Sequence, residues 1–357
     1  MKRTNIVNLK DTSLCMTLIM LSAGMAFFPA EVSDAVRETV LNCLNILIPS
    51  LFSFMAVGSM LSKSGSAALI AKPLKPVYHC IFRMPENIFT VFLLSMIAGY
   101  PVGIKMISDM LERGDIDPET AEKSACFCYC GGPAFFSGAI GLTVFGNKKV
   151  GVLIFLSVLI TNIMLALVVC RTSELHEKHL CSKYCKGNIL VDGVQSAGRS
   201  MALICITVIF FSAVMSVLDA SGVIGIIRRI FSLSDNEIVI VSSFIEITSL
   251  SELSGVPYKL LPWICASCSF GGLCIIIQLY ALKSDKLSLF RFIELRPFAA
   301  VLSALLCKIL QPLIIDEAVP ALAMNKSLFK VNNFAASICL ILMIFLLNYK
   351  KGLVFSE

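Results

Sequence analysis

Charged residues are scarce in this sequence. Asp, Glu, Lys and Arg make up 15% of its 357 residues, against about 25% in a typical soluble protein. Hydrophobic residues make up 57%, and the mean hydropathy is +0.85. The apolar residues gather in blocks of about 20, the length that crosses a hydrocarbon core of roughly 30 Å. This composition excludes a soluble globular protein and indicates an integral membrane protein with several spans.

Groups suited to acid–base catalysis are also rare. The chain has three histidines, and it lacks a phosphate-binding glycine loop, a zinc-protease helix motif and a nucleophile elbow. We therefore expect no catalytic residues and no enzyme activity. His176, His179, Cys181 and Cys185 are ligand types suited to zinc, but their spacing matches no strong site, so no metal site is predicted. Most of the 15 cysteines lie in apolar blocks, where cysteine behaves as a small hydrophobic residue.

The net charge of +6 does not indicate a nucleic-acid partner. The basic residues, such as Lys2, Arg3 and Lys10, lie in short segments beside apolar blocks, which is the pattern of topology signals. The expected partners are a lipid bilayer and a small-molecule solute. No cofactor is predicted, and the sequence leaves open a coupling ion, Na⁺ or H⁺, and assembly into a homo-oligomer.

Ten apolar blocks predict an all-α fold, a polytopic membrane protein of about 8–10 transmembrane or re-entrant helices, because backbone groups facing lipid must bond within their own segment. We expect an N-terminal transmembrane helix within 1–35, a first repeat over 36–170, a basic loop over 171–196, a second repeat over 197–296 and C-terminal transmembrane helices over 297–357. The first block ends at Phe27-Phe28-Pro29-Ala30, which is no convincing cleavage site, so we interpret it as a retained span. The blocks lie near residues 14–29, 40–62, 88–108, 124–145, 150–170, 198–218, 236–256, 258–282, 297–315 and 331–349.

Two segments of the chain match each other. Residues 52–65 (FSFMAVGSMLSKSG) and 209–222 (IFFSAVMSVLDASG) share seven identities in fourteen positions. A weaker match pairs Cys130-Gly131-Gly132 with Phe270-Gly271-Gly272. Two copies of a helical unit, each with a broken segment, are typical of secondary transporters, and accidental helix similarity is the alternative.

The basic loops predict a cytoplasmic N-terminus. If all ten blocks cross, the repeats are parallel and the basic segment 171–186 lies outside, against the usual bias. If one segment before residue 171 dips into the membrane and returns, the repeats are inverted and this loop becomes cytoplasmic. We favour the inverted arrangement. If the second half contains a matching re-entrant segment, Lys283 and Lys286 lie in the cytoplasm. Arg228 and Arg229 then lie outside, against the usual bias.

The first candidate site is the run from Ala98 to Lys105. Glycine and proline interrupt a helix here and free backbone amides to meet a solute. Lys105 follows within an apolar stretch and suits an anionic substrate, although a lysine reaching the interface is an equal alternative. The predicted solute-binding residues are Gly99, Tyr100, Pro101, Gly103 and Lys105.

The second candidate site surrounds Glu246. This carboxyl lies well inside an apolar block, where an acid needs an ion, a proton or a basic partner. The hydroxyls of Thr248 and Ser249 are suitable companions, and a buried structural acid is the alternative. The paired glycines Gly271 and Gly272, followed by Gln278, form a third candidate site, although close helix packing is the commoner role of such pairs.

At these residues the chain resembles the sporulation integral membrane protein YlbJ family, which carries paired nucleoside-recognition or Gate domains. The resemblance covers Ile48-Pro49-Ser50-Leu51-Phe52, Ala98 to Lys105, Ile245-Glu246-Ile247-Thr248, and Phe270-Gly271-Gly272 with Gln278, in that order. The two repeats would then be Gate-like, similar to the inverted repeats of concentrative nucleoside transporters. The chain departs from the family at Cys128-Tyr129-Cys130-Gly131-Gly132-Pro133, where an Asn- and Ser-rich stretch is usual.

The resemblance implies a sporulation-associated transporter or permease in the cell or forespore membrane. Its substrate would be a small polar, anionic metabolite, with a dipicolinate-like dicarboxylate implied by the family. The alternatives are a nucleoside-type transporter and a structural or assembly protein of the spore envelope that moves no solute.

Overall fold

The described part of the chain is all helical. The computed structural model describes residues 9–64, 71–172, 175–176, 188–253 and 255–315, and no strand occurs among them. All of these residues belong to one compact unit, Met1–Ala321. The predicted block at 331–349 lies outside the described residues. Within them, the predicted all-α class is confirmed.

Four helical stretches are long and apolar enough to cross a membrane. They are α8 (Lys148–Thr172), α9 (Ile189–Ala220), the stretch Tyr258–Leu282 and α14 (Phe290–Ile314). A fifth candidate is the pair α1 (Leu9–Phe27) and α2 (Pro29–Asn42), which is bent by 94° where Pro29 begins the second helix. These stretches confirm a multi-pass integral membrane protein. The predicted boundaries at 196/197 and 296/297 fall inside α9 and α14.

The outer faces of the spans are apolar. On α14, Val301, Leu305 and Ile309 are 60%, 54% and 64% exposed, and their spacing of four residues places them on one stripe. Such a stripe would be costly in water, at about 25 cal/mol for each Å² of apolar surface. Contact with lipid removes that cost, so this face is suited to the bilayer.

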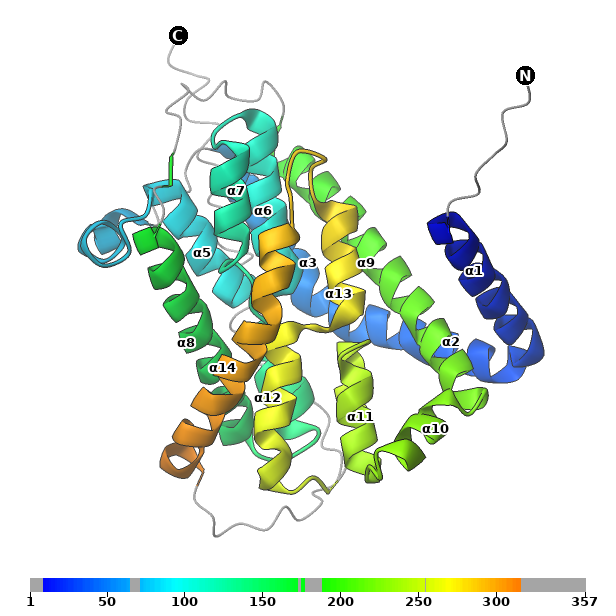
Figure 1. Ribbon diagram of the computed structural model, residues 1–357. Coiled ribbons are helices and arrows are strands. Elements are labelled where there is room, and N and C mark those ends of the chain that lie inside the picture. The colour runs from blue at the N-terminus through cyan, green and yellow to red at the C-terminus, as the bar shows by residue number, and fades with distance from the viewer. Residues whose placement is uncertain (1–8, 65–70, 173–174, 177–187, 254, 316–357) are drawn as a thin grey trace, which may run out of the picture. The chain divides into compact units, whose positions relative to one another are not determined.

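Several other segments are short helices interrupted by irregular backbone. The pair α5 (Glu86–Ala98) and α6 (Tyr100–Arg113) is interrupted at Gly99, and the two helices pack against each other (Figure 1). Helix α7 (Pro118–Ala125) is followed by irregular backbone and by the π-helix η4 (Phe135–Leu142). Helix α11 (Asp235–Ser243) is followed by the 3₁₀-helix η5 (Ile247–Glu252). The remaining elements are η1 (Cys43–Leu47), α3 (Ile48–Ser64), η2 (Lys72–Leu74), η3 (Val77–Phe82) and α10 (Val223–Ile230).

The third span is also interrupted. It consists of η6 (Tyr258–Leu260), α12 (Leu261–Phe270) and α13 (Gly272–Leu282). Gly271 and Gly272 have φ angles of +89° and +81°, a left-handed conformation that glycine adopts without steric cost. The break therefore falls midway along a membrane-length stretch.

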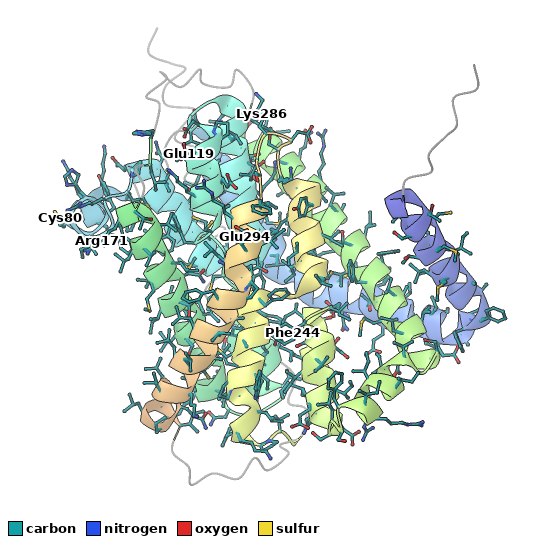
Figure 2. All side chains as sticks on the ribbon, in the orientation of Figure 1. Cys80, Glu119, Arg171, Phe244, Lys286 and Glu294 are labelled. Carbon is teal, nitrogen blue, oxygen red and sulfur yellow. The ribbon has the colours of Figure 1, made fainter. Side chains whose placement is uncertain are left out.

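Contacts between distant segments define two ends of the described unit. The first end contains the segment that links α6 to α7, and we call it the linker end. Here the His176 backbone N–H donates to Thr120 Oγ1 at 3.1 Å and the Ser288 hydroxyl donates to Glu122 at 3.3 Å. At the other, the far end, the rings of Phe145 and Tyr258 stack with centroids 5.9 Å apart. Helix α8 therefore runs from the far end to the linker end, and α14 runs back. Figure 2 shows Glu119 and Lys286 together at the linker end, away from Phe244.

The two segments that match in sequence lie on helices that contact each other. Residues 52–64 belong to α3 and residues 209–220 to α9, and these helices pack together. Gly193 permits close approach near the start of α9, because a Cβ added there would meet the Met60 side chain and the Ala56 carbonyl. The contact therefore joins the first matching segment to the start of α9, whereas Ser212 in the second matching segment hydrogen-bonds to Thr39 and Ala35 on α2.

Candidate functional site

Glu246 lies in the backbone break between α11 and η5. Its φ and ψ angles of −135° and 111° are extended, so the helix stops at this point. The side chain is only 5% exposed, and Thr248 Oγ1 donates a hydrogen bond to Glu246 Oε2. The backbone N–H of Ser249, also buried, donates to the Glu246 carbonyl at 3.2 Å. The three predicted residues of this cluster therefore form one local polar group.

The break at Glu246 docks against the break in the third span. The N–H groups of Leu273 and Cys274, at the start of α13, donate to the carbonyls of Phe244 and Ile245, both at 2.9 Å. A Cβ on Gly272 would lie 3.1 Å from the Ser243 carbonyl oxygen, so glycine permits this approach. Each break thus satisfies backbone groups that the other leaves free. Because the third span is interrupted midway, Glu246 lies at about the same depth.

Two thiols lie near the Glu246 carboxyl, and one of them contacts an amide. Cys43 and Cys274 both interact electrostatically with it, and Cys205 hydrogen-bonds to Cys43. The Gln278 amide, 4% exposed, donates to the Cys274 sulfur at 3.4 Å. Residues of η1, α9 and α13 therefore lie near the acid, and Glu246, Thr248, Gly272 and Gln278 belong to one cluster.

In the first half of the chain, a second pair of helix interruptions lies close together. Gly99 has a φ of +103°, and a Cβ there would lie 3.6 Å from the Gly132 backbone nitrogen. Pro101 follows in the first turn of α6. Gly103 packs between the Ser95 side chain and the Cys128 carbonyl, so it serves close packing.

Two tyrosines join the halves. The Tyr100 hydroxyl donates to the Cys268 carbonyl at 2.6 Å, and the Tyr129 hydroxyl donates to the Phe270 carbonyl at 3.1 Å. Their rings lie 5.0 Å apart and both side chains are buried. Of the predicted residues, Tyr100 and Gly271 thus meet through Tyr129, which lies in the segment that departs from the family pattern.

Arg296 on α14 is a functional candidate that sequence reasoning missed. Its guanidinium is fully buried between the rings of Tyr129 and Phe292, with centroids at 4.9 and 4.7 Å, and it donates to the Cys126 carbonyl. Its Nε and Nη1 have no hydrogen-bond partner among the described residues. The signal in the sequence was a cation directly before the apolar block at 297–315. A buried Arg needs such aromatic and carbonyl contacts to offset its desolvation.

Lys105 does not face Glu246. Its ammonium pairs with Asp109 on the next turn of α6, at 2.5 Å, and it lines a cavity of about 390 Å³ between α6, α9 and α13. A larger hollow of about 1170 Å³ lies between α12 and α14, but its lining is mainly apolar, as with Trp263 and Leu305. The smaller cavity therefore has the polar chemistry of a solute site.

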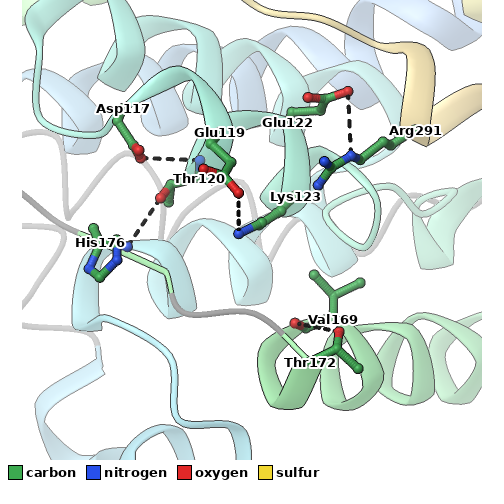
Figure 3. A network of polar contacts seen from close by, with 9 residues as sticks. All are labelled: Asp117, Glu119, Thr120, Glu122, Lys123, Val169, Thr172, His176 and Arg291. Atoms are coloured by element: carbon green, nitrogen blue, oxygen red, sulfur yellow. Dashed lines mark hydrogen bonds and ion pairs between the residues drawn. The ribbon is translucent and has the colours of Figure 1, made fainter.

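A polar network closes the linker end (Figure 3). Glu119 accepts from Lys123 at 2.8 Å, and this bond lowers the pKa of the Glu119 carboxyl below its usual value. Glu122 lies 4.0 Å from Arg291 at the start of α14, and Thr120 holds the His176 backbone. The network ties α7 to α14 and to the segment after α8. Of the four zinc-type residues considered above, only His176 is described.

These features define a class of protein: a multi-pass, all-α membrane protein with interrupted helices that meet around buried polar groups. The chain is similar to the sporulation integral membrane protein YlbJ of Bacillus subtilis, with 22% identity over 280 residues that cover 70% of this chain and 69% of that protein. This similarity confirms the resemblance seen in the motifs. No family model matches the chain, and no solved structure matches it.

Proposed function

We propose that this protein is a carrier that moves a small polar, anionic metabolite across a membrane. The observation that carries the proposal is the meeting of two helix breaks at a buried carboxyl, Glu246, midway along a spanning stretch. An acid at that depth is costly unless it handles an ion, a proton or a solute. Broken helices at mid-depth are the usual place for a carrier's solute site.

We propose further that the two halves are related repeats of opposite orientation. Helix α6 ends at the linker end, and the stretch from α7 to η4 then runs from that end to the far end. Helix α11 begins at the far end, where Glu237 interacts with Lys259, and the stretch from α12 to α13 runs to the linker end. The order of broken segments is the same and the direction is reversed, as inverted repeats require.

The similarity to a protein named for sporulation supports a role in that process for this chain. The family resemblance implies a dicarboxylate such as dipicolinate as the solute. In this proposal the N-terminus and the segment between α8 and α9 face the cytoplasm, and the host membrane is the cell or forespore membrane.

The proposal predicts that Glu246→Gln removes transport. Uptake of a labelled dicarboxylate into liposomes that contain the purified protein should fall at least about tenfold, the loss that accompanies roughly 1.4 kcal/mol of ion or solute binding. The matched control is Glu294→Gln, an exposed acid on α14, which should transport like the unchanged protein. Runs with Na⁺ gradients and with H⁺ gradients identify the coupling ion.

Unchanged uptake by Glu246→Gln would rule out this site. Uptake of nucleosides in place of dicarboxylates would favour the nucleoside alternative. Flux of neither solute, with a co-purifying partner, would favour the assembly role.

A further inference from the structure

The cavity between α6, α9 and α13 contains charged side chains that do not belong to the helix interruptions described above. Its volume of about 390 Å³ is in the range of roughly 300–1000 Å³ typical of small-molecule sites. Most of its polar wall comes from one face of α9, because the residues concerned recur at spacings of three and four. The wall consists of Lys105, Asp192, Gln195, Ser196, Arg199 and Ser200, and the apolar remainder is Leu203, Ala281 and Leu282.

The polar face lies on the N-terminal part of α9, directly before the apolar stretch 201–218 that makes this helix a candidate span. Charged side chains next to a span are costly in lipid and normally line water or meet a partner. Here they turn toward α6 and α13 and line the cavity. The arrangement forms a polar chamber that opens to the surface at Gln195 and Arg199, whose side chains are exposed.

The charge that faces this chamber without a counter-ion is Arg199. Lys105 is paired with Asp109 at 2.5 Å, and Asp192 has an interaction of its own. Among the described residues, Arg199 makes no ion pair and no hydrogen bond. A guanidinium binds a carboxylate through two parallel N–H donors, which a lysine cannot do.

We propose that this cavity binds a small organic anion, with Arg199 holding its carboxylate and Gln195 and Ser196 offering further hydrogen bonds. The proposal rests on the proposed carrier function and names where the solute is taken up before it reaches Glu246. Along α13, Leu282 in the cavity wall, Gln278 and Cys274 lie four residues apart, on one face. Cys274 interacts with Glu246, so a line of side chains connects the cavity to the acid.

The test is binding of phthalate, an aromatic dicarboxylate, to the purified full-length protein in neutral detergent, measured by calorimetric titration. Phthalate should bind, and its neutral diamide should not. Arg199→Gln should weaken phthalate binding at least about tenfold, and Arg199→Lys should give an intermediate loss. Arg229→Gln is the matched control because Arg229 is an exposed arginine on α10, outside the cavity.

Equal phthalate affinity in Arg199→Gln and Arg229→Gln would overturn the proposal, provided that both variants melt at the temperature of the unchanged protein. Thermal stabilisation by phosphatidylglycerol without any effect of phthalate would assign the cavity to a lipid headgroup and would also overturn it. Glu246→Gln separates this proposal from the carrier function. In one outcome, phthalate binding still depends on Arg199 in the Glu246→Gln variant while neither that variant nor the unchanged protein transports a solute. This result would refute the carrier function and leave the binding site in place.

Discussion

Gly271 is the residue at which the interrupted third span touches the first half of the chain. Its φ of +89° is left-handed, and an added Cβ would overlap the Tyr129 hydroxyl. The Tyr129 hydroxyl donates to the neighbouring Phe270 carbonyl, so it cannot move away without losing that bond. This one position therefore couples backbone conformation to the contact between the halves.

We predict that Gly271→Ala destabilises the protein. A left-handed alanine costs about 1 kcal/mol, and overpacking adds roughly 1–3 kcal/mol. The measurement is thermal unfolding in detergent, in which this variant should melt several degrees lower. Gly225→Ala on α10 is the control because its Cβ would meet nothing within 4 Å. Equal melting temperatures in the two variants would contradict the packing described for Gly271.

Individual polar residues were predictable where an apolar block isolates them. Glu246, Thr248 and Gln278 were predicted for that reason, and the structure places them together. The pairing of Lys105 with Asp109 was missed, although the spacing of four residues on a helix favours it. Arg296 and Tyr129 were missed because their partners come from distant segments, and no local pattern reports such contacts. The binding roles of all the predicted site residues remain predictions.

At the scale of elements, apolar blocks predicted where helices occur better than where they end. The block at 150–170 corresponds to α8, and the block at 258–282 to the third span. The block at 88–108 is two helices that pack side by side, since Gly99 turns the chain between them. A sliding average of hydropathy cannot distinguish a turn from a crossing, because both have the same apolar composition.

The ends of the elements give a topology that can be measured. We predict that Asp115→Cys, beside α6, and Ser288→Cys, before α14, react with a membrane-impermeant thiol reagent from the same side. Lys148→Cys, at the start of α8, should react from the other side, since that position follows Phe145 at the far end. In the orientation proposed above, the linker end faces the cytoplasm.

The labelling requires intact cells and inverted vesicles, in a variant without the 15 native cysteines. If the cysteines at positions 115 and 148 react from the same side of the membrane, the direction described for α8 is contradicted. Reaction of 115 and 288 from outside would leave the fold intact but reverse its orientation.

At the scale of the whole molecule, composition alone predicted a multi-pass membrane protein, because too few charges exist to cover a surface exposed to water. The substrate did not follow in the same way. In the proposed site, solute recognition depends on a few side chains from distant helices, such as Arg199 on α9 and Lys105 on α6, and packing brings these side chains to one cavity. Similarity of fold does not fix a substrate either.

The central claim of the proposed function is that a solute reaches the buried carboxyl of Glu246 during transport. The most direct measurement places a cysteine there, Glu246→Cys in the cysteine-free variant, and follows its reaction with a small, charged thiol reagent in sealed vesicles. The account predicts a reaction that saturating dicarboxylate slows. A residue that reacts only with lipid-soluble reagents, or at a rate that no solute changes, would contradict the claim.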